Sequence, residues 1–185
     1  VFYADVSKLD TEKEYPLISI YRREKILKLK SDKNKKLSLG AELLLIYALK
    51  KYYKDIMLPL EFSFGKYGKP EIPGIQFSLA HASDVAVCAV SDKAVGVDIE
   101  RIDRKSDRVA KRAFSENEQK FEFAYIWTRK EAAVKADGGG IALGLSDIDV
   151  TKDFVTINGK SYRIISIKPE ITGYYLALCV QSDVD

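Results

Sequence analysis

Two short stretches of the chain carry charged side chains at spacings that could do chemistry. In the first, Asp98 and Glu100 stand two residues apart at the end of an apolar run, and a strand puts such a pair on one face. In the second, Glu131 and Lys135 stand four apart, so a helix places them on one face as well. If they converge, three carboxylates and a lysine suit a hard divalent cation and a phosphate ester. Magnesium takes oxygen ligands and leaves places for water and substrate phosphate.

Each of these charges also has an ordinary interpretation. Acids at the end of a strand are often simply exposed to water. Glu131 and Lys135 could form a helix-surface ion pair, which stabilises a helix by only about 0.2–0.5 kcal/mol. The residues alone leave both interpretations open.

Apolar periodicity and turn residues indicate the elements that must position these charges. We expect helices over four segments: 18–30, 39–53, 109–114 and 115–136. Ser38 is the expected N-cap of the second helix, and Ser115 with Glu118 forms a capping box for the fourth, which Gly138 ends. Strands are expected over 75–79, 85–90, 94–99, 148–151, 154–157, 162–167 and 174–180. Asn158-Gly159 is a strong hairpin signal between two of them.

The two halves of the 185-residue chain resemble each other, which predicts an α+β protein of two similar lobes with pseudo-twofold symmetry. Each half has helix followed by strands, and each has an apolar strand with a central cysteine, Cys88 or Cys179. We expect an N-terminal lobe over 1–103, which contains the two strand-end acids, and a C-terminal lobe over 104–185, which contains the helical pair. Both cysteines are expected to be buried free thiols of a reducing cytosol.

A series of motifs resembles the 4'-phosphopantetheinyl transferase superfamily, in particular its larger, two-lobed (Sfp-type) kind. The resemblance extends from about residue 39 to about residue 145, and the motifs follow the order of the family. They are YGKPEIP at 67–73, FSLAHA at 77–82, GVDIE at 96–100, FSENE at 114–118 and WTRKEAAVKADGGG at 127–140.

The resemblance implies a fold, a reaction and a metal. Such enzymes move the 4'-phosphopantetheine arm of coenzyme A onto a serine of an apo acyl or peptidyl carrier protein and release adenosine 3',5'-bisphosphate. These carriers serve fatty-acid, polyketide or nonribosomal-peptide biosynthesis. The implied Mg²⁺ ligands are Asp98, Glu100 and Glu131. Glu131 is also the implied base for the serine hydroxyl, and Lys135 would neutralise the pyrophosphate. Glu118 matches a recurrent acid of the family, although its capping role explains it equally well.

The coenzyme A site is implied by the same resemblance. It assigns coenzyme A binding to six residues: Arg22, Lys25, Lys36, Lys69, Pro70 and His81. Relatives usually have serine beside the histidine, whereas this chain has Ala80 and Ala82. We expect the loss of these hydroxyl donors to weaken the binding of coenzyme A and to leave the metal ligands unaffected.

The charge and the hydropathy of the chain limit the kinds of partner that it could bind. The net charge is +3, yet the segment 22–36 holds eight basic residues against two acids, so it could attract a polyanion or an acidic protein, or simply be a solvated helix face. No nucleic-acid recognition motif accompanies this charge. No apolar run reaches the roughly 18–20 residues that span a bilayer, and the first residues show no signal peptide. We expect a cytoplasmic monomer with no nucleic-acid or membrane partner.

Two rival functions belong to other classes. A non-catalytic module that binds coenzyme A or a carrier protein could descend from the enzyme, and only Ala80 and Ala82 favour it. A generic magnesium phosphohydrolase could use the same acids, but it would not explain the 67–73 motif or the single histidine, His81.

Overall fold

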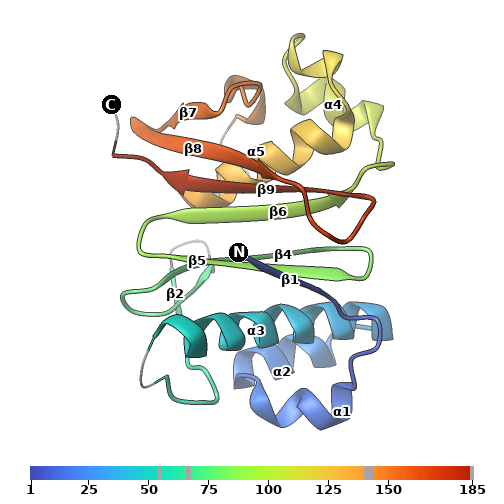
Figure 1. Cartoon of the computed structure of the whole chain (residues 1–185), viewed down its shortest axis with the longest axis vertical. Coiled ribbons are helices and arrows are strands. Elements are labelled where there is room, and N and C mark those ends of the chain that lie inside the picture. Colours follow the sequence, from blue (N-terminus) through green and yellow to red (C-terminus); the bar gives the residue numbers. More distant parts are fainter. Residues whose placement is uncertain (54–55, 66–67, 140–143, 184–185) are drawn as a thin grey trace. The chain divides into compact units, whose positions relative to one another are not determined.

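The computed structural model describes residues 1–53, 56–65, 68–139 and 144–183, in two compact units, Val1–Asp92 and Lys93–Asp185. In each unit a long helix packs on an antiparallel sheet, which confirms the α+β class (Figure 1). The division lies earlier than the expected boundary at 103/104. The reason is that β6 (Val95–Arg101) pairs along its whole length with β9 (Tyr174–Gln181). Asp98 and Glu100 therefore lie in the same unit as Glu131.

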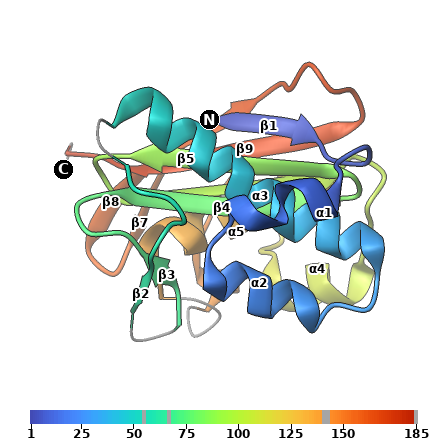
Figure 2. The ribbon, with the colours of Figure 1, turned by 90° about the horizontal axis from the view of Figure 1, so that it is seen from below.

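The first unit is built on a three-stranded sheet of order β1-β5-β4. Its strands are β1 (Phe2–Asp5), β4 (Gln76–Ala82) and β5 (Val85–Ser91), with a separate two-stranded ribbon of β2 (Ser63–Phe64) and β3 (Pro70–Glu71). Its helices are α1 (Thr11–Glu14), α2 (Ile20–Leu27) and α3 (Asp32–Tyr52). Helix α3 packs on the sheet, and α2 lies beside it (Figure 2).

The start of α3 differs from the prediction. The helix begins at Asp32 and not near residue 39, because the polar residues before Leu39 continue the helix instead of breaking it. Ser38 is therefore a buried residue within the helix and not its N-cap. Ser19 caps α2, since its hydroxyl accepts a hydrogen bond from the backbone N–H of Arg22 at 3.1 Å.

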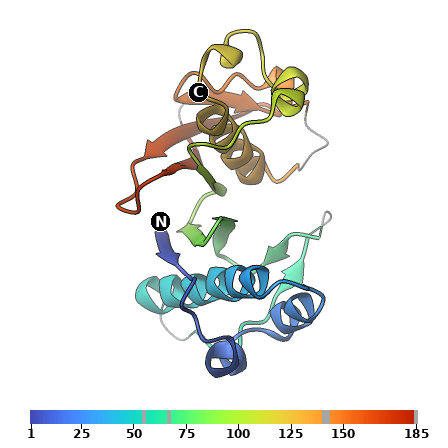
Figure 3. The ribbon, with the colours of Figure 1, turned by 90° about the vertical axis from the view of Figure 1, so that its right-hand side faces the viewer.

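The second unit is a four-stranded antiparallel sheet of order β6-β9-β8-β7. Its remaining strands are β7 (Phe154–Ile157) and β8 (Lys160–Ile167), and its helices are α4 (Asp107–Ala113) and α5 (Phe123–Asp137). Helix α5 packs mainly on β6 and β9 (Figures 1 and 3).

The predictions for the end of the long helix and for the hairpin turn are confirmed. Gly138 ends α5 with a left-handed φ of 78°, and Asn158 and Gly159 turn the β7–β8 hairpin with φ of 50° and 75°. The prediction of one helix over 115–136 was wrong. A short 3₁₀ turn, Glu118–Lys120, precedes α5, because Glu118 turns inward instead of continuing a helix. The segment 148–151, expected as a strand, pairs with no strand in the part of the chain that the structure describes.

The core of each unit is formed by its long helix and sheet. In the first unit, Leu45 and Leu49 of α3 pack with Phe77 and Cys88; in the second, Ile126 of α5 packs within a cluster that includes Cys179. Both cysteines are free and buried, as predicted, and burial raises the pKa of each thiol to about 12. Among the described residues, no helix is long and apolar enough to cross a membrane.

Candidate active site

Strand β6 and helix α5 touch backbone to backbone at Gly96. A β-carbon at this position would overlap the carbonyl oxygen of Ala132 and lie 2.5 Å from the backbone nitrogen of Ala136, so only glycine permits the approach. Alternation along β6 puts Asp98 and Glu100 on the same face of the strand as Gly96. The two acids therefore face the helix that carries Glu131 and Lys135.

Lys135 reaches Asp98 directly. Its Nζ donates to Asp98 Oδ1 at 2.6 Å and to the carbonyl oxygen of Val97 at 3.3 Å. Asp98 is only 7% exposed, and its second oxygen, Oδ2, is buried without a hydrogen-bond partner among the described residues. Burial raises the pKa of the Asp98 carboxyl to about 6; Lys135 opposes this shift, and the negative charge of nearby Glu131 adds to it.

Glu100 has a different counter-ion. Arg104, four residues further on, forms an ion pair with it, and the side chains of Arg104 and Glu100 are 39% and 14% exposed. The Arg104 guanidinium also lies over the rings of Phe123 and Trp127, at 5.8 and 5.5 Å from their centroids. No sequence pattern points to Arg104, because a four-residue spacing indicates contact on a helix but not beyond the end of a strand.

The carboxylate oxygens at this place are of the chemical type that a divalent cation binds. Carboxylate oxygens are the ligands that Mg²⁺ prefers, and the unpaired Oδ2 of Asp98 is a buried oxygen that needs a partner. In the described ranges, however, no three His, Cys, Asp or Glu side chains are grouped so that they could hold a metal ion. Lys135 pairs with Asp98 and Arg104 with Glu100. The assignment of Asp98, Glu100 and Glu131 as ligands stays a prediction.

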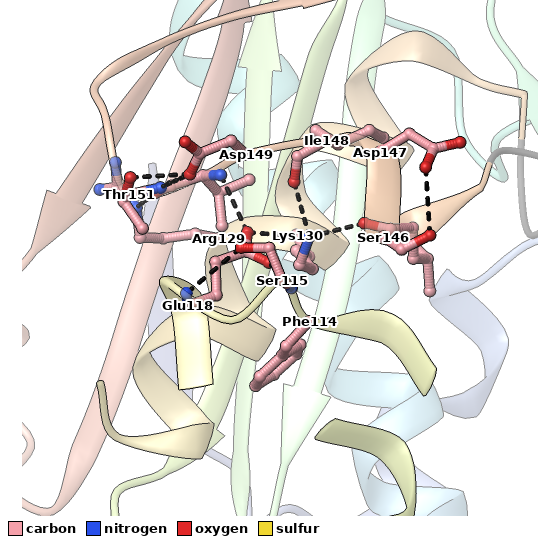
Figure 4. A network of polar contacts seen from close by, with 12 residues as sticks. Phe114, Ser115, Glu118, Arg129, Lys130, Ser146, Asp147, Ile148, Asp149 and Thr151 are labelled. Atoms are coloured by element: carbon pink, nitrogen blue, oxygen red, sulfur yellow. Dashed lines mark hydrogen bonds and ion pairs between the residues drawn. The ribbon is translucent and has the colours of Figure 1, made fainter. Parts of the chain in front are cut away.

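A buried ion pair fixes α5 against the segment that follows it. Lys130 is fully buried, and its Nζ lies 2.9 Å from Glu118 Oε1 and 2.6 Å from the carbonyl oxygens of Leu145 and Ile148 (Figure 4). Glu118 also accepts hydrogen bonds from the backbone N–H groups of Ser115 and Val150, at 2.7 and 3.0 Å. Ser115 Oγ in turn accepts a hydrogen bond from the backbone N–H of Glu118 at 3.3 Å, so the two bonds of the capping box form, but they lie at the 3₁₀ turn and do not cap α5. Lys130 and Glu131 are adjacent on α5, so they lie on different faces of the helix.

The basic residues predicted for coenzyme A in the first unit have partners of their own. Arg22 is 6% exposed; its Nε donates to Glu42 Oε2 at 3.0 Å and its Nη1 to Ser38 Oγ at 3.3 Å. Lys36 donates to the carbonyl oxygen of Ser7 at 2.7 Å. Partial burial, together with the charge of Arg22, lowers the pKa of Lys25. Their roles as phosphate ligands stay predictions, and Arg22 would have to bind a ligand from within a buried network.

Lys69 and Pro70 line a pocket of about 230 Å³ in the first unit. Its walls continue through the segment 71–77 and Ser63, and burial lowers the pKa of Lys69. His81 is exposed on β4, whereas Ala80 and Ala82 are buried on the opposite face of the strand. The two alanines therefore face the core, and the structure does not place them beside the imidazole.

Comparison with known proteins agrees with these motifs. The sequence profile of the 4'-phosphopantetheinyl transferase superfamily matches residues 94–179. The 4'-phosphopantetheinyl transferase Sfp of Bacillus subtilis (strain 168) is 27% identical over 159 residues, which cover 78% of this chain and 71% of Sfp. The 4'-phosphopantetheinyl transferase gsp of Aneurinibacillus migulanus is 30% identical, covering 71% of this chain and 64% of gsp. Another 4'-phosphopantetheinyl transferase of Bacillus subtilis is 34% identical, covering 72% and 66%.

A solved structure, the holo-[acyl-carrier-protein] synthase (AcpS) of Thermotoga maritima, is also similar. It is 21% identical with a TM-score of 0.36, over 48% of this chain and 62% of that one, and this likeness adds nothing to the assignment. The chain belongs to the 4'-phosphopantetheinyl transferase superfamily. Its relatives are of the Sfp type, and the chain spans 64–71% of the length of the three named here.

Proposed function

We propose that the chain transfers the 4'-phosphopantetheine arm of coenzyme A to a serine of an apo acyl or peptidyl carrier protein. Membership of the superfamily supports this reaction. The observation that carries it is the contact between Asp98 and Lys135, with Glu131 one helical turn before Lys135 on α5. A carboxylate with an unused oxygen, an ammonium and a second carboxylate are thereby held by two rigid elements, as transfer from a pyrophosphate requires.

The metal in this proposal is Mg²⁺, held by Asp98, Glu100 and Glu131. When bound, it would neutralise negative charge on the pyrophosphate and so favour departure of the bisphosphate. The unpaired Oδ2 of Asp98 supports a ligand at this place. Arg104 engages Oε1 of Glu100, so Oε2 would be the oxygen that serves the metal.

Two residues of the chain take part in the chemical step of this proposal, Glu131 and Lys135. The serine oxygen forms a bond to the phosphorus that carries the pantetheine arm, the bond from that phosphorus to the oxygen of the adenosine bisphosphate breaks, and the serine proton must be removed. Glu131 accepts this proton, directly or through one water. Lys135 neutralises charge on the phosphates, as cationic clamps do in phosphoryl transfer generally. Lys130 takes no part, because it is buried against Glu118.

Coenzyme A binding is proposed for the first unit. The pocket beside Lys69 and Pro70 supports the nucleotide end of the coenzyme there, and His81 offers an exposed imidazole. The basic segment 22–36 would steer an acidic carrier protein by its positive potential.

The two buried free thiols suit the reducing cytosol, so we also propose a cytoplasmic location, and we propose a monomer.

One experiment separates this function from its rivals. The protein is incubated with coenzyme A, Mg²⁺ and an apo acyl carrier protein, and the carrier is weighed by mass spectrometry. The expected result is a carrier heavier by one phosphopantetheine, with adenosine 3',5'-bisphosphate released. A module without catalytic activity would leave the carrier unchanged, and a phosphohydrolase would cleave the coenzyme without modifying it.

Two variants test the site in the same assay. Asp98→Ala should abolish the transfer. Asp103→Ala is its matched control, because Asp103 is an exposed acid nearby in the chain that pairs with Arg101 and not with the site. Full transfer by Asp98→Ala at millimolar Mg²⁺ would overturn the assignment of the metal site.

A further inference from the structure

The turn of the β7–β8 hairpin consists of Asn158 and Gly159, the one place in the sequence where asparagine precedes glycine. Both residues are exposed, and both have positive φ, 50° and 75°, as the central residues of a type I′ turn require. The tip of an exposed hairpin is a part of a fold that tolerates local opening. The pair therefore lies where water and backbone motion can act on it, and it plays no part in the function proposed above.

An asparagine that precedes glycine can react with its own backbone. The backbone nitrogen of the glycine attacks Cγ of the asparagine, the bond from Cγ to Nδ2 breaks, and the proton of the attacking nitrogen leaves with Nδ2 as ammonia. Water then opens the resulting succinimide ring at either carbonyl group, which gives aspartate or isoaspartate. Glycine favours the first step, because it has no β-carbon to hinder the approach of the nitrogen to Cγ.

Asn158 also joins the hairpin to the end of α5. Its Nδ2 donates a hydrogen bond to Oδ2 of Asp137, the last residue of α5, at 3.0 Å. The hydroxyl of Tyr162, in β8, donates to Oδ1 of the same carboxylate at 3.3 Å. Burial and the charge of Asp137 raise the pKa of Tyr162 to about 12, so this hydroxyl keeps its proton. Both oxygens of Asp137 thus bind the β7–β8 hairpin.

We propose that Asn158 is a site of spontaneous deamidation, and that the change releases the β7–β8 hairpin from the end of α5. Aspartate at position 158 replaces the donor to Asp137 by a second negative charge, and two carboxylates at such a distance repel each other. Isoaspartate adds one methylene group to the backbone of a two-residue turn, whose length fixes the register of the hairpin. Either product weakens the second unit as the protein ages.

The modification can be followed on the wild-type protein. Samples are incubated for weeks at mildly alkaline pH, which favours loss of the backbone proton, and their peptides are analysed by mass spectrometry. Asn158 should convert into two products of equal mass, aspartate and isoaspartate. Asn34 and Asn117 are internal controls, because both are exposed but precede lysine and glutamate, and they should stay intact. No conversion of Asn158, or equal conversion of all three asparagines, would overturn the proposal.

Asn158→Asp measures what the modification does to the fold. The variant should lower the melting temperature by about 2–4 °C, the shift that the loss of one hydrogen bond gives in a chain of this size. Amide hydrogen exchange over 154–167 should become faster. Asn117→Asp is the matched control: it adds the same charge at an exposed position, where Lys120 Nζ already donates to Asn117 Oδ1 at 2.9 Å. Equal falls in the two variants would show an effect of net charge and contradict the release.

An exchange of the two residues tests the contact itself. In the double variant Asp137→Asn with Asn158→Asp, the amide at position 137 can donate to the carboxylate at position 158, and the net charge is that of the wild type. The melting temperature and the hydrogen exchange should return close to wild-type values. A double variant as unstable as Asn158→Asp would show that this contact does not hold the hairpin. Neither readout uses coenzyme A or a carrier, so the outcome is independent of the proposed transfer.

Discussion

The Nζ atom of Lys135 lies 2.6 Å from Oδ1 of Asp98, and the other oxygen of this buried carboxylate has no hydrogen-bond partner among the described residues. A buried acceptor without a partner costs stability, on the order of 1–3 kcal/mol. The site thus holds an oxygen that does not serve the stability of the metal-free protein. A substitution of Asp98 should therefore impair transfer without lowering the stability of the protein.

Asp98→Asn tests that separation. The amide keeps the shape of the side chain but removes the negative charge from a buried place. We expect transfer to be lost while the melting temperature of the metal-free protein stays the same or rises, as differential scanning calorimetry would measure. Asp103→Asn, at an exposed position, should change neither quantity. A large fall in the melting temperature of Asp98→Asn would show that the Lys135 contact is structural.

Gly96→Ala tests the contact between β6 and α5. The added methyl group would overlap backbone atoms of Ala132, which cannot rotate away as the end of a long side chain can. Overpacking of this kind costs about 1–3 kcal/mol or more. Denaturation in urea should show this loss of stability, and transfer should fall because Glu131 and Lys135 are displaced from Asp98. If Gly96→Ala were as stable as the wild type, β6 and α5 could move apart at no cost, and the prediction would be wrong.

The pair of Glu118 and Lys130 can be tested by a double-mutant cycle. Lys130→Met leaves the Glu118 carboxylate buried without its ammonium partner, which should cost about 3–5 kcal/mol of unfolding free energy. Glu118→Gln combined with Lys130→Met should cost less than the sum of the two single changes, because no charge is then left unpaired. Strictly additive losses, measured by urea denaturation, would show that the two groups do not interact.

Glu131→Gln distinguishes a base from a ligand. The amide keeps one ligand oxygen but cannot take a proton. If Glu131 is both ligand and base, the variant should retain measurable Mg²⁺-dependent binding of coenzyme A by calorimetry and lose most of its turnover. Binding and turnover that fall in parallel would leave Glu131 a ligand only, and water would then have to take the serine proton, since Glu118 is buried against Lys130.

The sequence by itself determined what depends on neighbours in the chain. Alternation along β6 put Asp98 and Glu100 on one face, helical periodicity did the same for Glu131 and Lys135, and Gly138 ended α5. These relations are set by the periods of strand and helix and by the freedom of glycine at positive φ. The order of the motifs was also enough to indicate the family.

Only the tertiary structure decided which groups pair over long distances in the chain. It placed β6 on β9, and so put Asp98 in the unit of Glu131 instead of the first lobe. It turned Glu118 inward onto Lys130, and it paired Arg22 with Glu42 inside the first unit. A buried charge must find an opposite partner wherever the fold supplies one, and no local spacing specifies that partner.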